Sequence, residues 1–409
     1  MNLKSVKAVI FDLDGTLLNS LGDLTDAVNY AVKPLGVRPS TEIEIKGRVG
    51  NGAGKLLERT LKANDVQADL DKCFERFSSY YREHMTCKTH AYDGIMELLT
   101  KLKKAGIKTA ILTNKFDLAA KEIAEHYFGN LIEYTQGEKQ GVPRKPDPTA
   151  CLEIMSMLGV EKENTVYIGD STVDVQTAKS AGVFSIAVSW GYCDRELTQD
   201  ADIVVDRAYE IENVIFGTDF ESIEKNFKKR GFGFSVFENK ESAVKYIAEK
   251  CKNKSVGFGG SVTLDQMNMF DVLKEQGTDV HWHWRNEDVY MDGEVYVTSA
   301  NGLSKNGEIV NIDGRCNRIS ATLYGTKHCI IVCGINKLAP DLEKAIERAR
   351  NISAPRNAQR LNKAVPCVKT GKCMDCSSPE RICRAMAILM NPPSDMECEV
   401  VLIKESLGY

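Results

Sequence analysis

The chain has 409 residues, several times the ~100–150 of a typical folding unit, so we expect at least two domains. Hydrophobic residues make up 43%, charged residues 27%, and the formal net charge is -4, a profile of soluble globular proteins rather than nucleic-acid binders. The apolar stretch 6–11 is too short for a signal-peptide core, and nothing approaches the ~20 apolar residues of a membrane span. We predict a cytoplasmic protein with no nucleic-acid or membrane partner, and the sequence leaves the oligomeric state open.

Short apolar runs alternate with helix-length segments from the start of the chain to about residue 215. This order predicts a parallel sheet with crossover helices. Residues 20–89 interrupt it with helical periodicity and read as a helical insert. The expected strands are residues 6–11, 108–112, 165–168, 184–188 and 202–205.

A second α/β series follows the break at Gly217-Thr218-Asp219. The sequence therefore predicts domains over residues 1–217 and 218–409. The second series is expected to contain strands at 232–237, 255–258, 280–284 and 329–334, with helices at 241–251, 262–276 and 338–349.

Two acids, Asp12 and Asp14, follow the first predicted strand directly. The carboxyl ends of parallel strands are where ligands bind in open α/β sheets. Carboxylates at this spacing can reach one small site, one as a nucleophile and the other as a proton carrier. Alone, the pair is also an ordinary turn sequence.

Three further segments carry polar groups to the same predicted sheet edge. Thr113 and Asn114 end a strand and could hold a phosphoryl oxygen, and Lys145 lies in a proline-stiffened loop. Asp170 and Asp174 follow another strand. Several acids in one site repel each other unless a cation neutralises them, and oxygen-only ligands favour Mg²⁺.

The segments Asp12-Leu13-Asp14-Gly15-Thr16, Thr113-Asn114, Lys145-Pro146 and Gly169-Asp170 with Asp174 resemble the four motifs of the haloacid dehalogenase superfamily. Leu17-Leu18-Asn19-Ser20 and Arg48-Val49-Gly50-Asn51-Gly52 look like its phosphoglycolate phosphatase branch. The resemblance covers about residues 1–215. It implies a Rossmann-like core with a helical cap, at about residues 20–89, inserted between the first and second motifs.

The same resemblance implies a role for each motif residue. Asp12 would attack phosphorus, Asp14 would carry the protons, and Thr113 with Lys145 would bind phosphoryl oxygens. Magnesium ligands would be the carboxylates of Asp12 and Asp170, the backbone carbonyl of Asp14, and Asp174 directly or through water. The acid at Asp14 favours phosphoryl transfer, because dehalogenases of this superfamily lack it.

Two glycine-containing segments, one in the helical insert and one in the second half of the chain, each allow a functional and a purely structural interpretation. Residues 50–55 could close over a substrate, with Lys55 or Arg48 meeting a second anion, or could be a solvated helix start. The turn at residues 257–263 could bind an anion at a helix start or simply connect strand to helix.

Four cysteines cluster near the end of the chain, although the total of 13 is odd. Cys367, Cys373, Cys376 and Cys383 have a spacing that could hold Zn²⁺ or an iron–sulfur cluster, and free thiols remain the alternative.

From about residue 221 the chain resembles the lactate-utilisation (LUD) domain family, through Gly257-Phe258-Gly259-Gly260-Ser261, Ser299-Ala300-Asn301-Gly302 and Asn311-Ile312-Asp313-Gly314 with Asn317-Arg318. The resemblance implies a second α/β fold and no settled activity. Asn301, Asp313, Asn317 and Arg318 are polar enough to line a pocket, but part of this sequence is also typical of a turn.

We therefore interpret the chain as a magnesium-dependent phosphomonoester hydrolase that acts on a small phosphorylated metabolite and is fused to a LUD-like domain. Two alternatives stay open at the level of the sequence. One is a phosphomutase of the same superfamily. The other is a redox or ligand-sensing protein whose working part is the cysteine-bearing second half.

Overall fold

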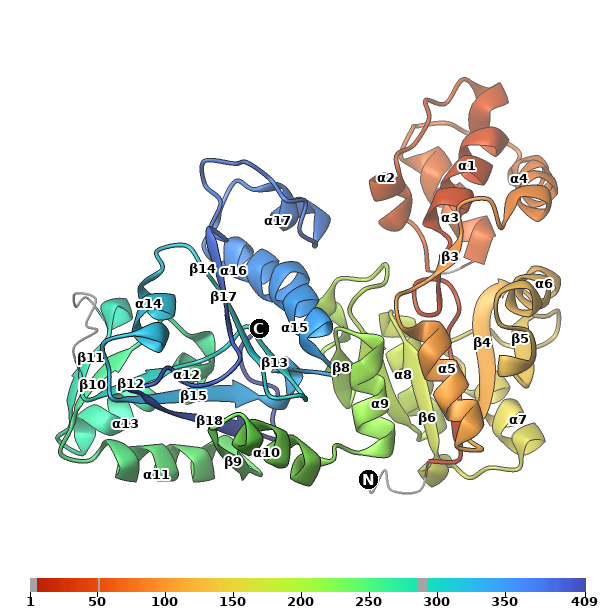
Figure 1. Ribbon diagram of the computed structural model, residues 1–409. Helices are drawn as coiled ribbons and strands as arrows, with labels where there is room; N and C mark the ends of the chain where they lie inside the picture. Colours follow the sequence, from red (N-terminus) through yellow and green to blue (C-terminus); the bar gives the residue numbers. More distant parts are fainter. Residues whose placement is uncertain (1–5, 51, 286–292) are drawn as a thin grey trace. The chain divides into compact units, whose positions relative to one another are not determined.

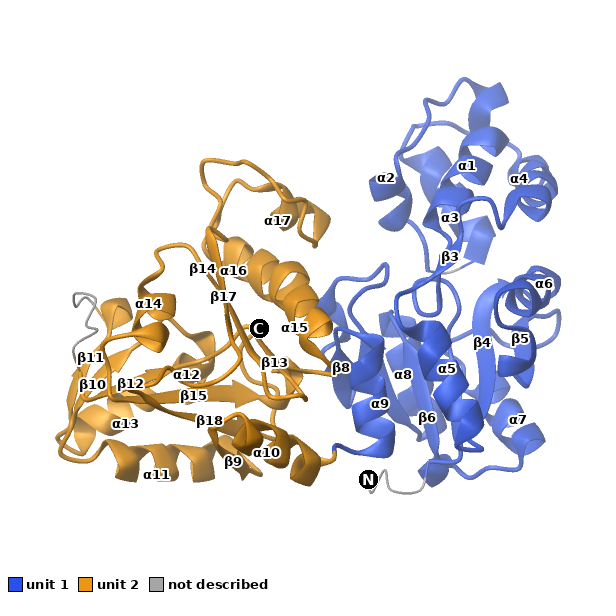
Figure 2. Ribbon diagram, viewed as in Figure 1, with its two compact units in different colours: residues 1–218 blue, residues 219–409 orange. Residues whose placement is uncertain are grey.

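The computed structural model describes residues 6–50, 52–285 and 293–409 (Figure 1). The chain divides into two compact units, Met1–Thr218 (unit 1) and Asp219–Tyr409 (unit 2), coloured separately in Figure 2. Both units are α/β, which confirms the predicted fold class. Within the described ranges, no helix is both long and apolar enough to cross a bilayer.

Unit 1 is built on a parallel sheet in the order β5-β4-β1-β6-β7-β8. Parallel neighbours need crossover connections, and helices occupy these crossovers along the chain. The strands are β1 (Ala8–Phe11), β4 (Lys108–Phe116), β5 (Tyr134–Glu138), β6 (Thr165–Gly169), β7 (Phe184–Val188) and β8 (Ile203–Val205). The helices are α5 (Ile95–Lys104), α6 (Asp117–Phe128), α7 (Thr149–Leu158), α8 (Thr172–Ala181) and α9 (Ala208–Phe216).

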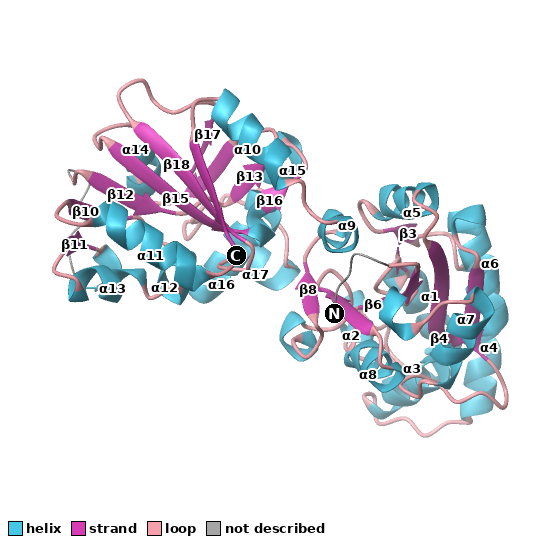
Figure 3. Cartoon of the chain, turned by 90° about the horizontal axis from the view of Figure 1, so that it is seen from below, coloured by secondary structure: helices cyan, strands magenta, loops and turns pink. Residues whose placement is uncertain are grey.

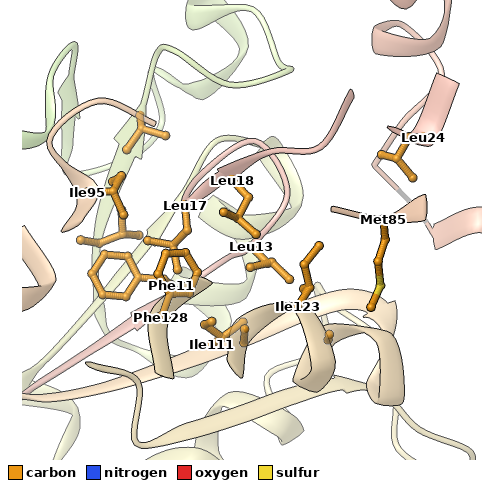
Figure 4. Packing of buried hydrophobic residues seen from close by; sticks show 14 of the residues in the cluster. Phe11, Leu13, Leu17, Leu18, Leu24, Met85, Ile95, Ile111, Ile123 and Phe128 are labelled. Carbon is orange, nitrogen blue, oxygen red and sulfur yellow. The ribbon is translucent and has the colours of Figure 1, made fainter. Parts of the chain in front are cut away.

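The central strand β1 is buried on both faces, as its uninterrupted apolar sequence requires. Val9 and Phe11 face one core, which α5, α6 and α9 cover, and Ala8 and Ile10 face the other, which α7 and α8 cover. Figure 4 shows Phe11 in the first core beside Phe128. This double burial fixes the carboxyl end of β1, and with it the first motif.

A helical cap leaves the core directly after the first motif. It consists of α1 (Leu21–Val32), α2 (Glu42–Lys46), α3 (Gly52–Lys62) and α4 (Leu70–His84). An antiparallel pair, β2 (Leu18–Asn19) with β3 (His90–Ala91), closes the base of this excursion. The residues just after the first motif are therefore tied to those that return from the cap.

Unit 2 combines a parallel sheet, β11-β10-β12-β15-β18-β9, with a mixed sheet, β16-β13-β14-β17. In Figure 3, from below, these strands are magenta and the helices cyan. The strands are β9 (Gly233–Phe237), β10 (Ser255–Phe258), β11 (Asp279–His281), β12 (Val295–Thr298), β13 (Gly302–Ser304), β14 (Ile309–Asp313), β15 (His328–Gly334), β16 (Leu338–Ala339), β17 (Ala385–Leu389) and β18 (Glu397–Ile403). The helices are α10 (Phe220–Lys229), α11 (Lys240–Cys251), α12 (Val262–Gln266), α13 (Met269–Glu275), α14 (Asn317–Leu323), α15 (Leu342–Arg348), α16 (Ala354–Arg360) and α17 (Pro366–Thr370).

Several expected elements differ from those found. Strand β5 was not expected from the sequence, because its polar residues lack strand patterning, but it pairs with β4 at the sheet edge. The expected helix 262–276 breaks at Asn268, whose φ of 54° ends one helix and starts the next. The expected strand 280–284 stops at His281, because Trp282 turns inward and stacks on Phe258 at 5.2 Å. The expected helix 338–349 starts only at Leu342, since β16 pairs with β13 first.

Candidate active site

Three adjacent strands of unit 1 carry the motif residues to one edge of the sheet. Strands β4, β1 and β6 are neighbours and parallel, so their carboxyl ends meet. Asp12 follows β1, and Asp170 follows β6. Thr113 lies in the last part of β4, whose pairing with β5 shifts register between Leu112 and Phe116.

Lys145 joins two of the acids. Its Nζ lies 2.7 Å from Asp12 Oδ1 and 2.7 Å from Asp174 Oδ1. All three side chains are buried, with exposed fractions of 4% for Lys145, 10% for Asp12 and 2% for Asp174. Burial lowers the pKa of Lys145, but the two carboxylates outweigh it and hold that pKa well above its ordinary value. The lysine is therefore a fixed positive charge.

Asp170 is the third acid of the cluster. It accepts hydrogen bonds from the Tyr192 backbone N–H (2.6 Å) and more weakly from Thr16 Oγ1 (3.4 Å). Burial and the neighbouring acids raise the pKa of Asp170 to about 8. Gly15, with a φ of 90°, packs against this carboxylate so closely that a Cβ at residue 15 would clash with it.

The three carboxylates can hold a metal ion. Within the described part of the chain, Asp12, Asp170 and Asp174 form the one group of acidic, histidine or cysteine ligands with three ligand atoms within 4.8 Å of one another. Burial also raises the pKa of Asp12 to about 6, against the opposing effect of Lys145. One ammonium does not balance three buried carboxylates, and an oxygen-only donor set suits a hard divalent cation.

Asp14 lies beside this cluster in a different environment. Ser20 Oγ donates a hydrogen bond to its Oδ1 at 2.5 Å, and Lys115 Nζ lies 3.1 and 3.0 Å from its two oxygens. Lys115 also donates to the hydroxyl of Tyr81 on cap helix α4, at 2.6 Å. Burial opposes the charge of Lys115, but Asp14 and Tyr81 raise its pKa above the ordinary value. Core and cap thus meet at this lysine.

A second hydrogen-bonded chain joins Asp14 to Asp170. Tyr192, whose backbone N–H binds Asp170, accepts a hydrogen bond from the backbone N–H of Ser20 at 2.8 Å on its hydroxyl. Ser20 in turn donates to Asp14. The two acids are therefore oriented by one connected set of groups.

Asn114 holds the loop that carries Lys145. Its Oδ1 accepts a hydrogen bond from the Lys145 backbone N–H at 3.1 Å, and its Nδ2 donates to the Lys145 carbonyl at 3.2 Å. The Thr113 side chain is buried and accepts a weak hydrogen bond from the Lys115 backbone N–H at 3.3 Å. The Asn114 amide therefore positions Lys145 through its backbone.

A cavity of about 990 Å³ lies above the acids, between the core and the cap. Asp12, Asp14, Thr113, Asn114, Lys145 and Asp170 line its floor, and Lys46 and Arg59 of the cap are among its other lining residues. The cap cations named from the sequence are engaged elsewhere: Lys55 pairs with Glu58 on the surface, and Arg48 donates to Ser40 Oγ.

The cysteine tail of unit 2 brings its thiols near one another. Burial raises the pKa of Cys367, and Cys383, Cys376 and Cys373 raise it further. Cys373 Sγ accepts from Arg350 at 3.6 Å and from the Asp375 backbone N–H at 3.4 Å. Three of these thiols do not come within 4.8 Å of one another among the described residues. Zinc or cluster binding stays a prediction.

Two family models match the chain, one in each unit. Residues 9–188 match the haloacid dehalogenase-like hydrolases, and residues 220–403 match the LUD domain. The chain belongs to the haloacid dehalogenase-like family through unit 1, which is a phosphatase of that superfamily, and it carries a LUD domain as unit 2. Both resemblances stated from the sequence are confirmed.

The curated relatives are similar to unit 1. The phosphoglycolate phosphatase of Agrobacterium fabrum is 34% identical over 206 residues, which are 48% of this chain and 87% of the relative. That of Chromobacterium violaceum is 32% identical over 225 residues, 53% of this chain and 99% of the relative. A solved structure of a predicted phosphoglycolate phosphatase from Haemophilus somnus is 27% identical, covers 51% of this chain and 98% of that one, and has a TM-score of 0.49.

Sequence reasoning missed four residues of this site: Ser20, Tyr81, Lys115 and Tyr192. Lys115 directly follows Thr113-Asn114 at a strand end, a position that could have marked it. Ser20 lies in a stretch that was noted only for its family resemblance. The two tyrosines lie far from every motif in the sequence, and only the fold brings them to the acids.

Proposed function

We propose that unit 1 hydrolyses small phosphate monoesters with Mg²⁺, through an aspartyl-phosphate on Asp12, and that phosphoglycolate is a preferred substrate. The main support is the buried cluster of Asp12, Asp170 and Asp174 beside Lys145 and Asp14. The names of the relatives support the choice of ester.

Asp12 is the nucleophile in this proposal. One of its carboxylate oxygens forms a bond to phosphorus while the ester P–O bond breaks, and the leaving alkoxide takes a proton from Asp14, which enters this step as the neutral acid and leaves it as a carboxylate. Asp14 then takes a proton from water, whose oxygen bonds to phosphorus as the Asp12–phosphorus bond breaks. Inorganic phosphate leaves and both acids return to their first state. Ser20 and Lys115 hold Asp14 in place for both proton transfers.

The carboxylates of Asp12 and Asp170, the backbone carbonyl of Asp14, and Asp174 directly or through water would hold Mg²⁺. The bound ion would neutralise charge on the transferring phosphoryl group. Lys145 adds a second positive charge next to the nucleophile, and Thr113 offers a hydroxyl to a phosphoryl oxygen.

A substrate with a second anionic group fits the cavity. Lys46 and Arg59 of the cap line it together with the acids of the core, and Arg59 Nη1 also donates to the Arg48 carbonyl at 2.7 Å. A carboxylate towards the cap would therefore meet Lys46, and a phosphate at the core would meet Lys145. This arrangement supports phosphoglycolate over a neutral phosphate ester.

The test is phosphate release from a panel of small phosphate esters, with Mg²⁺ and with a chelator. Replacing the nucleophile in Asp12→Asn should keep the fold and lower kcat by about 10⁴-fold or more. Asp200→Asn removes a carboxylate that is 88% exposed, and should leave activity unchanged. Appreciable Mg²⁺-dependent turnover by the Asp12 variant would contradict the mechanism. Release of inorganic phosphate without a bisphosphate activator would exclude the phosphomutase alternative.

A further inference from the structure

A second cavity, of about 310 Å³, lies entirely within unit 2. The three segments that carry the LUD resemblance converge on it, although they are far apart in the sequence. Gly260 and Ser261 come from the turn after β10, Ser299 and Asn301 from the turn after β12, and residues 312–315, 317 and 318 from the end of β14 and the start of α14. A volume of this size suits a small metabolite.

Lys337 places a buried amino group in the wall of this cavity. Its exposed fraction is 4%, and its Nζ donates to Thr263 Oγ1 and to Ser299 Oγ, both at 2.7 Å. It forms no ion pair with a carboxylate of the described residues. Burial lowers its pKa to about 7; Cys333 opposes this effect, and Arg348 and Arg318 add to it. A buried ammonium held only by neutral hydroxyls lacks the counter-charge that such groups normally have.

Arg318 adds a second positive charge to the same cavity. Its Nη2 donates to Asn301 Oδ1 at 3.0 Å and to the Ile312 carbonyl at 2.6 Å, so the guanidinium is fixed by neutral groups. Asp313 lies nearby and accepts from the backbone N–H groups of Arg318 and Ile319. Among the described lining residues, Arg315 and Arg360 are further cations, so positive charge exceeds negative charge.

Two buried nitrogen atoms in the cavity lining lack a partner. His283 Nδ1 and Asn317 Nδ2 make no hydrogen bond to any described residue. A buried polar group without a partner destabilises the folded protein, and an oxygen atom of a ligand would offset this cost. The cavity thus presents positive charge, hydroxyl groups and an unused amide donor together.

We propose that this cavity binds a small metabolite with an oxyanion group, either a phosphate ester or a carboxylate, whose charge is met by Lys337 and Arg318. Thr263 and Ser299 donate hydroxyls beside Lys337, and Asn317 Nδ2 supplies a further donor. This site is separate from the phosphatase site, because every lining residue belongs to unit 2.

Tryptophan fluorescence can report on this site in the full-length chain. The chain has three tryptophans: Trp190 in unit 1, and Trp282 and Trp284 in unit 2. Trp284 lines the cavity, and Arg360 lies over its ring at 4.7 Å. In a Trp190→Phe background all tryptophan emission comes from unit 2, so anion binding at the phosphatase site is not detected directly.

The titrations use inorganic phosphate and, separately, acetate, in EDTA and at constant ionic strength. We expect a saturable change in emission with at least one of them. Lys337→Met should weaken this binding tenfold or more. Lys245→Met, which removes an exposed lysine of α11, is the matched control and should bind as the background does. Asn317→Ala should weaken binding about threefold to tenfold without lowering Tm, because its Nδ2 has no partner in the protein to lose.

The outcomes separate the two sources of the oxyanion. Saturation with phosphate alone identifies a phosphate ester, saturation with acetate alone a carboxylate, and saturation with both the shared oxyanion chemistry. The proposal is overturned if neither anion saturates up to about 50 mM, which corresponds to binding weaker than about 2 kcal/mol. The proposal is also overturned if Asn317→Ala and Lys337→Met bind the anion with the same affinity as the Trp190→Phe background. If Lys337→Met does not fold, the affinity of Asn317→Ala decides.

Discussion

Replacing Lys115 with Met should damage catalysis more than substrate binding. The lysine lies 3.0 Å from Asp14 and donates to Tyr81 of the cap, so it holds the proposed proton carrier and ties core to cap. Methionine keeps most of the volume of the side chain and removes its charge. Asp14 would keep the hydrogen bond from Ser20 but lose its cation.

The size of the effect follows from the burial of this pair. At 3.0 Å and an effective dielectric constant of about 20, the attraction is about 5.5 kcal/mol before desolvation is subtracted. Removing one partner of a buried pair typically costs about 3–5 kcal/mol. The exposed fraction of Asp14 is 16%, so water can reach it, and we expect about 3 kcal/mol. For a unit of this size, that loss lowers Tm by about 6–12 °C.

The assay combines thermal melts with steady-state phosphate release. We expect kcat to fall about 10²- to 10⁴-fold, the usual contribution of a positioned proton carrier, with a smaller change in KM. Lys115→Arg should recover part of kcat. Lys121→Met, which removes a lysine with a 47% exposed side chain on α6, should match the wild type. A Lys115→Met protein with unchanged kcat would refute the assignment of Lys115 as a positioning residue.

Three further predictions concern the acids, the units and the cysteines. In EDTA, the Tm of the unit 1 transition should fall as the pH rises from 6 to 8, because burial raises the pKa of Asp12 to about 6 and of Asp170 to about 8, so folded unit 1 holds protons that its unfolded chain has released. Asp170→Asn should reduce this slope. A protein ending at Thr218 should melt cooperatively and keep its hydrolytic activity, because the proposed catalytic residues lie in unit 1. Anaerobically purified protein should contain zinc or iron, which Cys373→Ser with Cys376→Ser should release.

Each of these predictions has an outcome that contradicts it. A unit 1 transition whose Tm is constant or rises over this pH range, measured by calorimetry, would mean that the acids are not held at raised pKa values. A truncated protein that folds but loses most of its kcat/KM would show that unit 2 contributes to the phosphatase site. Absence of both metals by elemental analysis would leave the cysteines as free thiols.

The sequence alone determined the family and the proposed catalytic acids, because these depend on local patterns. A strand with an unbroken apolar sequence must be buried on both faces, and parallel neighbours bring the ends of such strands together. The order and spacing of the four motifs therefore predicted that Asp12, Asp170 and Lys145 would meet. Local chemistry also predicted the break near Gly217, close to the observed division after Thr218.

Tertiary packing alone decided which groups support these acids. Tyr81 and Lys115 are 34 residues apart, and Tyr192 is 172 residues from Ser20, so no local pattern links them. The sequence also left open what Asn114 does, whereas the fold turns its amide to the Lys145 backbone. Tertiary packing also decided the structure of residues 280–284. Their alternating sequence favours an extended strand, but the burial of Trp282 against Phe258 ends the strand early.

The cavity of unit 2 shows this division most clearly. The sequence indicates its turns as polar and glycine-rich segments. Lys337 lies at the end of a short 3₁₀ helix after β15, and no sequence motif marks it as part of a site. Only the parallel sheet brings it next to Thr263 and Ser299, which are 74 and 38 residues away. Burial then acts on the charge of Lys337, because the surroundings of an ionisable group are set by the whole fold and not by its neighbours in the sequence.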